Sequence, residues 1–208
     1  MIDIKGINHN INIDEFISFY IKMINRNLNL LGVHSQNTAS LSVILASEFG
    51  FNHFDIKTLN YGALLHDIGK MFVPAEILNA SRMLTPVEFE IIKTHTVAGW
   101  EALDNFKSLP PEIKSFAISH HHRNGFGYPK YLMYSIDIDP VLIDILTVAD
   151  SFSAIMEPRV YKEKTTFIKS YEIITDKENP KNNGLNFDIL DRLKFLIDNN
   201  KIKLENFY

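Results

Sequence analysis

Hydrophobic residues recur at helical spacing along almost the whole chain. Two clear series are Leu41, Ile44, Leu45 and Phe49 in the first quarter of the chain, and Phe187, Leu190, Leu193 and Leu196 near its end. Side chains three and four positions apart share one face of an α-helix. No segment shows the alternation of apolar and polar residues that a half-buried strand requires. The pattern therefore predicts an all-α protein.

Proline and glycine divide these series into about seven or eight predicted helices. Such breaks occur at Gly50, Pro74, Pro86, Pro110-Pro111, 124–129, Pro140, Pro158 and Pro180. The 208 residues, 46% of them hydrophobic, suffice for one buried core and are few for two independent domains. We expect a single helical bundle, in which segment 32–208 carries the chemistry and segment 1–31 is an added N-terminal helix.

The helix expected from Asp14 to about Leu31 has more apolar surface than one narrow stripe provides. Its apolar residues are Phe16, Ile17, Tyr20, Ile21, Met23 and Ile24. Two interpretations follow: the helix caps the core of its own chain, or it pairs with a second subunit. We favour the cap, because surplus apolar surface is only a pointer to an interface. A homodimer or a signalling-protein partner stays the alternative.

Composition narrows the classes of function. The formal net charge of −4 argues against a long nucleic acid as partner, because duplex binding normally leaves a basic face. No apolar run approaches the roughly 20 residues that cross a bilayer, so we expect no membrane span and a cytoplasmic protein. The chain has no cysteine, so imidazole and carboxylate are the side chains with which it could hold a transition metal.

Most of the histidines fall into one set of potential metal ligands. The set consists of His34, His66-Asp67, His95, His120-His121-His122, and Asp150 after an apolar run. An unpaired buried carboxylate at Asp150 would cost several kcal/mol, and a metal ion would offset that cost. Taken singly, His34, His95 and Asp150 are more often structural residues than ligands. Together they favour a shared site with two divalent ions bridged by Asp67, a pairing that suits in-line displacement at phosphorus.

Residues beside these ligands supply charge and backbone donors. In the segment Ala63–Lys70, Lys70 follows His66 by four positions and Asp67 by three, so on a helix the three side chains share one side and Lys70 could meet a phosphate. The loop from Gly125 to Pro129 contains two glycines, which let the backbone approach a ligand closely. Such a turn is usually only a turn, and its place after the histidines makes it a candidate.

The ordered motifs resemble one known family. They are His34, HDIGK, His95, the histidine triplet followed by NGFGYP, VADSFSAI, PRVYK and GLNFD. This set is similar to the HD-GYP branch of the HD superfamily of metal-dependent phosphohydrolases. The resemblance implies an all-helical HD domain with two or three iron or manganese ions. It also implies hydrolysis of cyclic di-GMP to pGpG or GMP by in-line attack of a metal-bridging hydroxide.

The resemblance also implies residue roles. One ion would be held by His34, His66, Asp67 and Asp150, and the other by Asp67, His95 and two histidines of the triplet, taken as His120 and His121. Asp67 and Lys70 would be the catalytic residues. Substrate would be bound by Lys70, Asn124, Gly125, Tyr128, Arg159 and Lys162. Mixed imidazole and carboxylate ligands fit iron or manganese.

The chain departs from the family pattern in two places. HHHRNG replaces the usual His-His-Glu motif and is one residue shorter, so the ligand pair could be His120-His121 or His121-His122. Leu30 stands where members with a third metal carry glutamate, which favours two ions. Three functions stay open: a cyclic di-GMP phosphodiesterase, a weakly active or non-catalytic module that binds cyclic di-GMP or recruits a partner, and a hydrolase of another cyclic dinucleotide or nucleotide.

Overall fold

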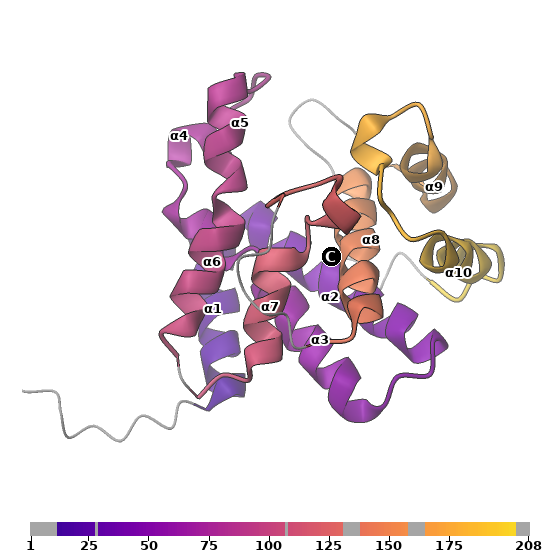
Figure 1. Ribbon diagram of the computed structural model, residues 1–208, viewed down its shortest axis with the longest axis horizontal. Helices are drawn as coiled ribbons and strands as arrows, with labels where there is room; N and C mark the ends of the chain where they lie inside the picture. Colours follow the sequence, from indigo (N-terminus) through magenta and orange to yellow (C-terminus); the bar gives the residue numbers. More distant parts are fainter. Residues whose placement is uncertain (1–11, 28, 107, 131–137, 158–164, 203–208) are drawn as a thin grey trace, which may run out of the picture.

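The computed structural model describes residues 12–27, 29–106, 108–130, 138–157 and 165–202. These residues form α-helices and short 3-10 helices, shown in Figure 1. The α-helices are α1 (Ile13–Asn27), α2 (Asn29–Glu48), α3 (His53–Leu65), α4 (Ala75–Leu78), α5 (Pro86–Lys93), α6 (His95–Asp104), α7 (Pro111–Ser119), α8 (Pro140–Met156), α9 (Phe167–Thr175) and α10 (Phe187–Asp198). The 3-10 helices are η1 (Ile68–Phe72), η2 (Arg123–Gly125) and η3 (Pro180–Asn182).

The all-α prediction is confirmed for the described part of the chain. That part contains ten α-helices rather than the seven or eight expected. Short elements account for the difference, since the four-residue α4 is too short to show a hydrophobic repeat and buries none of its residues. The boundary between α5 and α6 falls at Thr94, a single residue without proline or glycine on either side, so the sequence marks no break there.

Helix α2 is the centre of the larger core. It packs against α3 on one side and α8 on the other, and α9 and α10 pack beyond α8 (Figure 1). The fully buried side chains between these helices include Leu41, Leu45, Leu59, Ile145 and Phe152. Helix α8 begins cleanly because Asp139 accepts a hydrogen bond from the Val141 amide and Pro140 occupies the first turn.

A second core lies under α1. Ile17, Tyr20 and Ile24 of α1 pack with Leu65, Ile68 and Leu103. The apolar face predicted for this segment is therefore buried in its own chain, as a capping helix requires, while Phe19 stays 65% exposed. The division of the chain at residue 31 stays a prediction.

The predicted limits of the first helix were wrong. Helix α1 ends at Asn27 and α2 already begins at Asn29, so Leu31 and His34 belong to α2. Asparagine side chains compete with helical hydrogen bonds and favour helix ends. Asn27 and Asn29 therefore marked the boundary between the two helices, although the apolar repeat continued across it.

Substitution of Phe116 by alanine should destabilise the fold strongly. This ring is fully buried in α7, and it fills the space beside Gly62 of α3, where a Cβ atom would lie 2.0 Å from the ring. We expect the free energy of unfolding to fall by about 3–5 kcal/mol in urea denaturation, because loss of the ring leaves a cavity between α3 and α7. Substitution of exposed Phe54 in α3 is the control, and equal losses in both variants would contradict this packing.

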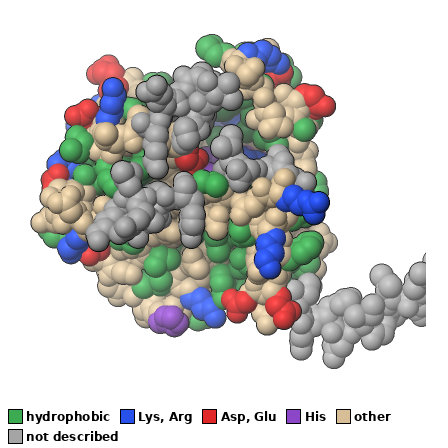
Figure 2. Space-filling model, turned by 180° about the vertical axis from the view of Figure 1, so that it is seen from behind, with side chains coloured by type: hydrophobic (Ala, Val, Ile, Leu, Met, Phe, Trp, Pro, Cys, Tyr) green, Lys and Arg blue, Asp and Glu red, His purple; other side chains and the backbone are tan. Residues whose placement is uncertain are grey.

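Charges on the surface are mixed. On the face shown in Figure 2, the described acidic and basic side chains are scattered among one another. Among the described residues, none of the helices is long and apolar enough to cross a membrane.

Candidate metal centre

Five elements bring the predicted ligands together in the middle of the protein. His34 comes from α2, His66 and Asp67 from the junction of α3 and η1, and His95 from the start of α6; the end of α7 supplies His120 and His121, and α8 supplies Asp150. All but His121 are buried to 7% exposure or less. Candidate ligand atoms within 4.8 Å of one another form three groups: His34, His66 and Asp150; His95, His120 and His121; and His66, Asp67 and His120. Asp67 thus lies between two clusters.

A change of helix type positions the His-Asp pair. Helix α3 ends at Leu65, and Asp67 precedes the 3-10 helix η1, so the predicted continuous helix through Lys70 is broken here. In a 3-10 helix, side chains three positions apart lie directly above one another. Lys70 accordingly forms an ion pair with Asp67. The two side chains are close together, as predicted, although the helix that carries Lys70 is a 3-10 helix and not an α-helix.

Backbone carbonyls fix the orientation of three histidine rings. Each donates its Nδ1 hydrogen to a carbonyl oxygen in its own or the preceding turn: His66 to Ala63 at 2.6 Å, His95 to Ile92 at 2.7 Å and His120 to Phe116 at 3.0 Å. A neutral imidazole with a hydrogen on Nδ1 has its lone pair on Nε2. These three Nε2 atoms are therefore acceptors.

The centre is consequently rich in acceptors that face one another. The Nε2 atoms of His95 and His120 are 3.2 Å apart, and Asp67 Oδ1 lies 3.2 Å from His95 Nε2. Within the described structure, His66 Nε2 and Asp67 Oδ1 are buried without a hydrogen-bond partner. Buried acceptors without donors are costly, and a cation between them removes the cost. The residues present therefore fit divalent metal ions.

In the cluster of His34, His66 and Asp150, two carboxylates lie against His34. His34 Nε2 lies 2.9 Å from Asp150 Oδ1, and His34 Nδ1 lies 3.1 Å from both carboxylate oxygens of Glu157. Burial lowers the pKa of His34, but its hydrogen bonds to Asp150 and Glu157 outweigh burial and raise this pKa to about 10. Glu157 was not among the predicted site residues, and its place directly before Pro158 gave no signal of a link to His34.

Protonation states in the rest of the centre suit metal binding. Burial lowers the pKa of His121 to about 3 and moves the pKa of His120 in the same direction. Burial would raise the pKa of Asp67, yet the positive charge of Lys70 holds it well below its usual value. Neutral imidazoles and an ionised carboxylate are the forms that bind cations.

The structure separates the three consecutive histidines. His120 and His121 point into the centre, whereas His122 Nδ1 lies 2.8 Å from the Pro129 carbonyl oxygen. Of the two pairs left open by the sequence, the geometry favours His120 and His121. His122 instead fastens the following loop, whose Gly127 amide also donates to the His122 carbonyl at 3.1 Å.

The glycine-containing loop covers the histidines. The ring of Tyr128 lies 4.6 Å, centroid to centroid, from the ring of His121. Gly125 has φ of 90°, and a Cβ atom on Gly127 would lie 1.7 Å from the His121 carbonyl oxygen, so both positions require glycine. The Asn124 side chain and the predicted phosphate- or guanine-binding residues Arg159 and Lys162 lie outside the described part of the structure.

Arg123 is a cation that the sequence places beside the site motifs, although the predicted ligand and substrate residues did not include it. Its backbone has φ of 48°, and its guanidinium donates a hydrogen bond to Ser151 Oγ at 2.8 Å, beside Asp150 in α8. Burial lowers the pKa of Arg123, and the charge of Asp150 opposes this shift. Gly184, which precedes α10, lies close to the backbone of Arg123, since a Cβ atom at Gly184 would be 2.2 Å from the Arg123 carbonyl oxygen. The position of Arg123 directly after the three histidines was the sequence feature that pointed to the site.

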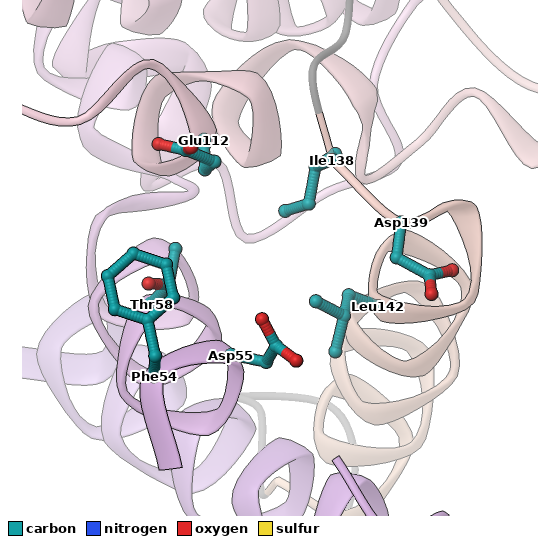
Figure 3. Close-up of a pocket in the computed structure, with 7 residues that line it drawn as sticks. All are labelled: Phe54, Asp55, Thr58, Glu112, Ile138, Asp139 and Leu142. Atoms are coloured by element: carbon teal, nitrogen blue, oxygen red, sulfur yellow. The ribbon is translucent and has the colours of Figure 1, made fainter. Parts of the chain in front are cut away.

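A separate cavity of about 360 Å³ lies between α3, α7 and the start of α8 (Figure 3). Its carboxylates include Asp55, which accepts a hydrogen bond from Asn52, and Asp139, which caps α8. These two acids have local structural roles. None of the predicted site residues lines this cavity.

Substitution of Gly69 by alanine should disturb the centre without removing a ligand. A Cβ atom at Gly69 would lie 1.9 Å from the His95 carbonyl oxygen and 2.6 Å from the Gly99 nitrogen, so α6 would have to move away from η1. We expect a loss of about 1–3 kcal/mol in the free energy of unfolding together with weaker metal binding. Urea denaturation and Mn²⁺ titration measure the two effects, and wild-type values for both would refute the proposed close contact.

Cation binding should strengthen as the pH rises. His34 carries a proton in the metal-free protein at neutral pH, since its pKa is raised to about 10, and a metal ligand must lose that proton. We expect the association constant for Mn²⁺ to increase about tenfold for each pH unit between about pH 6.5 and 8.5. His34→Gln should remove this dependence and His53→Gln, at the exposed start of α3, should keep it. An association constant independent of pH would contradict the assignment.

An all-α bundle with a buried cluster of histidines and aspartates defines this chain as a domain suited to divalent metal ions. The HD domain family model matches residues 18–181. The chain therefore belongs to the HD domain family, and the family predicted from its motifs is confirmed.

Curated relatives and solved structures agree with this family. A cyclic di-GMP phosphodiesterase of Thermotoga maritima is 38% identical over 131 residues, which are 62% of this chain and 35% of that protein. The 3'3'-cGAMP-specific phosphodiesterase 2 of Vibrio cholerae is 31% identical over 137 residues, 65% of this chain and 26% of that protein. The chain thus spans about a third or less of these relatives.

Two solved structures share the fold. The PgpH HD domain of L. monocytogenes superposes with a TM-score of 0.59 and 22% identity, covering 87% of this chain and 96% of that chain. An HDG"Y"P protein of Bdellovibrio bacteriovorus gives a TM-score of 0.63 and 18% identity, covering 92% of this chain and 65% of that one.

Proposed function

We propose that this chain is a metal-dependent phosphodiesterase domain that hydrolyses cyclic di-GMP to pGpG, GMP or both. The observation that carries the proposal is the centre around Asp67, where His66 Nε2 and Asp67 Oδ1 are buried without a hydrogen-bond partner in the described structure and Lys70 pairs with the same carboxylate. A relative with 38% identity that is described as a cyclic di-GMP phosphodiesterase supports the choice of substrate.

The centre would hold two divalent ions, iron or manganese. One would be bound by His34, His66 and Asp150, the other by His95, His120 and His121, with Asp67 bridging both. Oxygen and imidazole nitrogen ligands without thiolate favour these metals in such a site. Divalent ions held in this way supply an activated water and neutralise phosphate oxygens during in-line displacement.

The residues of the chain would orient the phosphodiester. The side chain of Lys70 is 24% exposed, so a ligand can reach it. Its ammonium group could then contact a phosphate oxygen while it stays near Asp67. Arg123 supplies a second cation near Asp150. Burial raises the pKa of Tyr128, so its phenol stays neutral and can donate a hydrogen bond to phosphate or a base. Gly125 keeps the loop backbone open to the ligand.

Arg159, Lys162 and Asn124 remain proposed substrate contacts on the strength of the motif alone. A second candidate substrate is 3'3'-cGAMP, since a relative with 31% identity is described as specific for it. The two dinucleotides share the phosphodiester ring and differ in one base, so the metal centre treats both alike and the choice depends on contacts to the bases.

Chromatography of products tests the proposal. Chain loaded anaerobically with iron or manganese is incubated with cyclic di-GMP or with 3'3'-cGAMP, and Asp67→Asn serves as the inactive control. We expect pGpG or GMP from cyclic di-GMP at the higher rate. Faster hydrolysis of 3'3'-cGAMP would make that dinucleotide, and not cyclic di-GMP, the proposed substrate. Intact dinucleotides with metal bound would reject catalysis and favour a module that binds the nucleotide, which calorimetry would detect.

A further inference from the structure

Glu157 connects the end of α8 to the histidine of α2. Its backbone amide donates to the Ser153 carbonyl at 3.0 Å, and its side chain turns back toward α2. Both carboxylate oxygens lie 3.1 Å from His34 Nδ1, and Asn37 Nδ2 donates to Oε1 at 3.3 Å. The side chain is only 16% exposed. Glu157 is therefore held in place behind the ring of His34, on the side away from the metal centre.

The other histidines of the centre have a different kind of partner. His66, His95 and His120 each place Nδ1 against a backbone carbonyl oxygen. His121 Nδ1 is 3.7 Å from Asp150 Oδ2, beyond hydrogen-bond distance. Within the described centre, His34 is thus the histidine whose Nδ1 lies within hydrogen-bond distance of a carboxylate. A carboxylate behind an imidazole fixes its tautomer, orients its ring and makes it a stronger donor to a metal ion.

This difference makes the two halves of the centre unequal. The half formed by His34, His66 and Asp150 contains one carboxylate ligand and has Glu157 directly behind it. The half formed by His95, His120 and His121 has imidazoles as its own ligands and shares Asp67 with the first. Opposite charges attract more strongly in a buried site than in water, so the carboxylate-rich half should attract a dication more strongly.

We propose that Glu157 is a positioning residue for His34, and that it makes the half formed by His34, His66 and Asp150 the tighter of two metal sites, the one that fills first. This inference rests on the proposed metal function of the same centre. It assigns Glu157 no contact with substrate, because His34 stands between this carboxylate and the other ligands.

Titration of the metal-free chain with Mn²⁺ tests the inference, with free Mn²⁺ followed by electron paramagnetic resonance and heats followed by calorimetry. We expect two classes of site in the wild-type protein. Glu157→Gln keeps the shape of the side chain and loses its charge, so it should weaken the tighter class by about 10–100-fold and leave the weaker class unchanged. Glu172→Gln, at an exposed position of α9, is the matched control and should change neither class.

Three results would overturn the inference: a single class of equal sites in the wild-type protein, unchanged affinities in Glu157→Gln, or equal weakening of both classes. Circular dichroism of the metal-free variants separates lost affinity from lost folding, and Glu157→Asp, which restores the charge, should recover part of the affinity. Product analysis is independent of this experiment. Two classes of Mn²⁺ site, with the tighter class weakened in Glu157→Gln but without hydrolysis, would reject the proposed function and keep the inference. Hydrolysis together with unchanged affinity in Glu157→Gln would keep the proposed function and reject the inference.

Discussion

Asp67→Ala should abolish both metal binding and turnover. The Oδ1 atom of Asp67 lies 3.2 Å from His95 Nε2, and Oδ2 lies 3.3 Å from His66 Nε2, so this carboxylate is shared by both halves of the centre. In the proposed two-ion centre, its removal would take a negative ligand from both ions at once. We expect activity to fall by more than about 100-fold, beyond the usual effect of changing a residue that merely supports a ligand.

Elemental analysis of metal bound per chain and the initial rate of cyclic di-GMP hydrolysis measure this effect together. Asp55→Ala is a suitable control, since Asp55 lies in α3 near the separate cavity of Figure 3 and accepts a hydrogen bond from Asn52. Two ions per chain in Asp67→Ala, or activity within a few-fold of wild type, would show that Asp67 does not bridge the ions.

Lys70→Met should separate catalysis from metal binding. Lys70 pairs with Asp67 from the next turn of η1, and part of its side chain is exposed toward solvent. The substitution keeps the apolar length of the side chain and removes the charge that would stabilise phosphate oxygens in the transition state. We expect kcat to fall by about 10²–10³-fold, as for loss of one preorganised donor to a developing charge, while the chain still binds two ions.

Steady-state kinetics on metal-loaded protein test this expectation, with Lys70→Arg as the variant that retains the charge. Lys169→Met, on α9, serves as a control for loss of a lysine elsewhere. An unchanged kcat in Lys70→Met would remove Lys70 from the chemistry. Loss of metal along with activity would instead assign it the role of holding Asp67.

The sequence was informative about the fold and the residues that meet because both depend on local patterns. Apolar residues at spacings of three and four predict helices, and helices that bury one face must form a bundle. The imidazoles of His34, His66 and His95 could be assigned to one centre because several ligand-type residues in fixed order resemble a known family. Their close approach in the structure follows from helix packing, to which Gly69 contributes by allowing η1 and α6 to touch.

Tertiary placement determines the features that the sequence concealed. Glu157 and His34 are separated by 123 positions, and no periodicity links a residue after the end of α8 to the face of α2. The change from α3 to η1 at Asp67 lacks a proline, so the apolar repeat suggested one continuous helix. The choice between the pairs His120-His121 and His121-His122 depends on the turn that directs His122 toward Pro129, which the sequence does not reveal.

The rate of cyclic di-GMP hydrolysis as a function of Mn²⁺ ions bound per chain tests the central claim most directly. If two ions held by Asp67 and its neighbouring histidines carry the reaction, activity should be low up to one ion per chain and should rise as the second is bound, with pGpG or GMP as product. Hydrolysis by the metal-free chain, or none with both sites filled, would contradict the proposal that this chain is a metal-dependent cyclic dinucleotide phosphodiesterase.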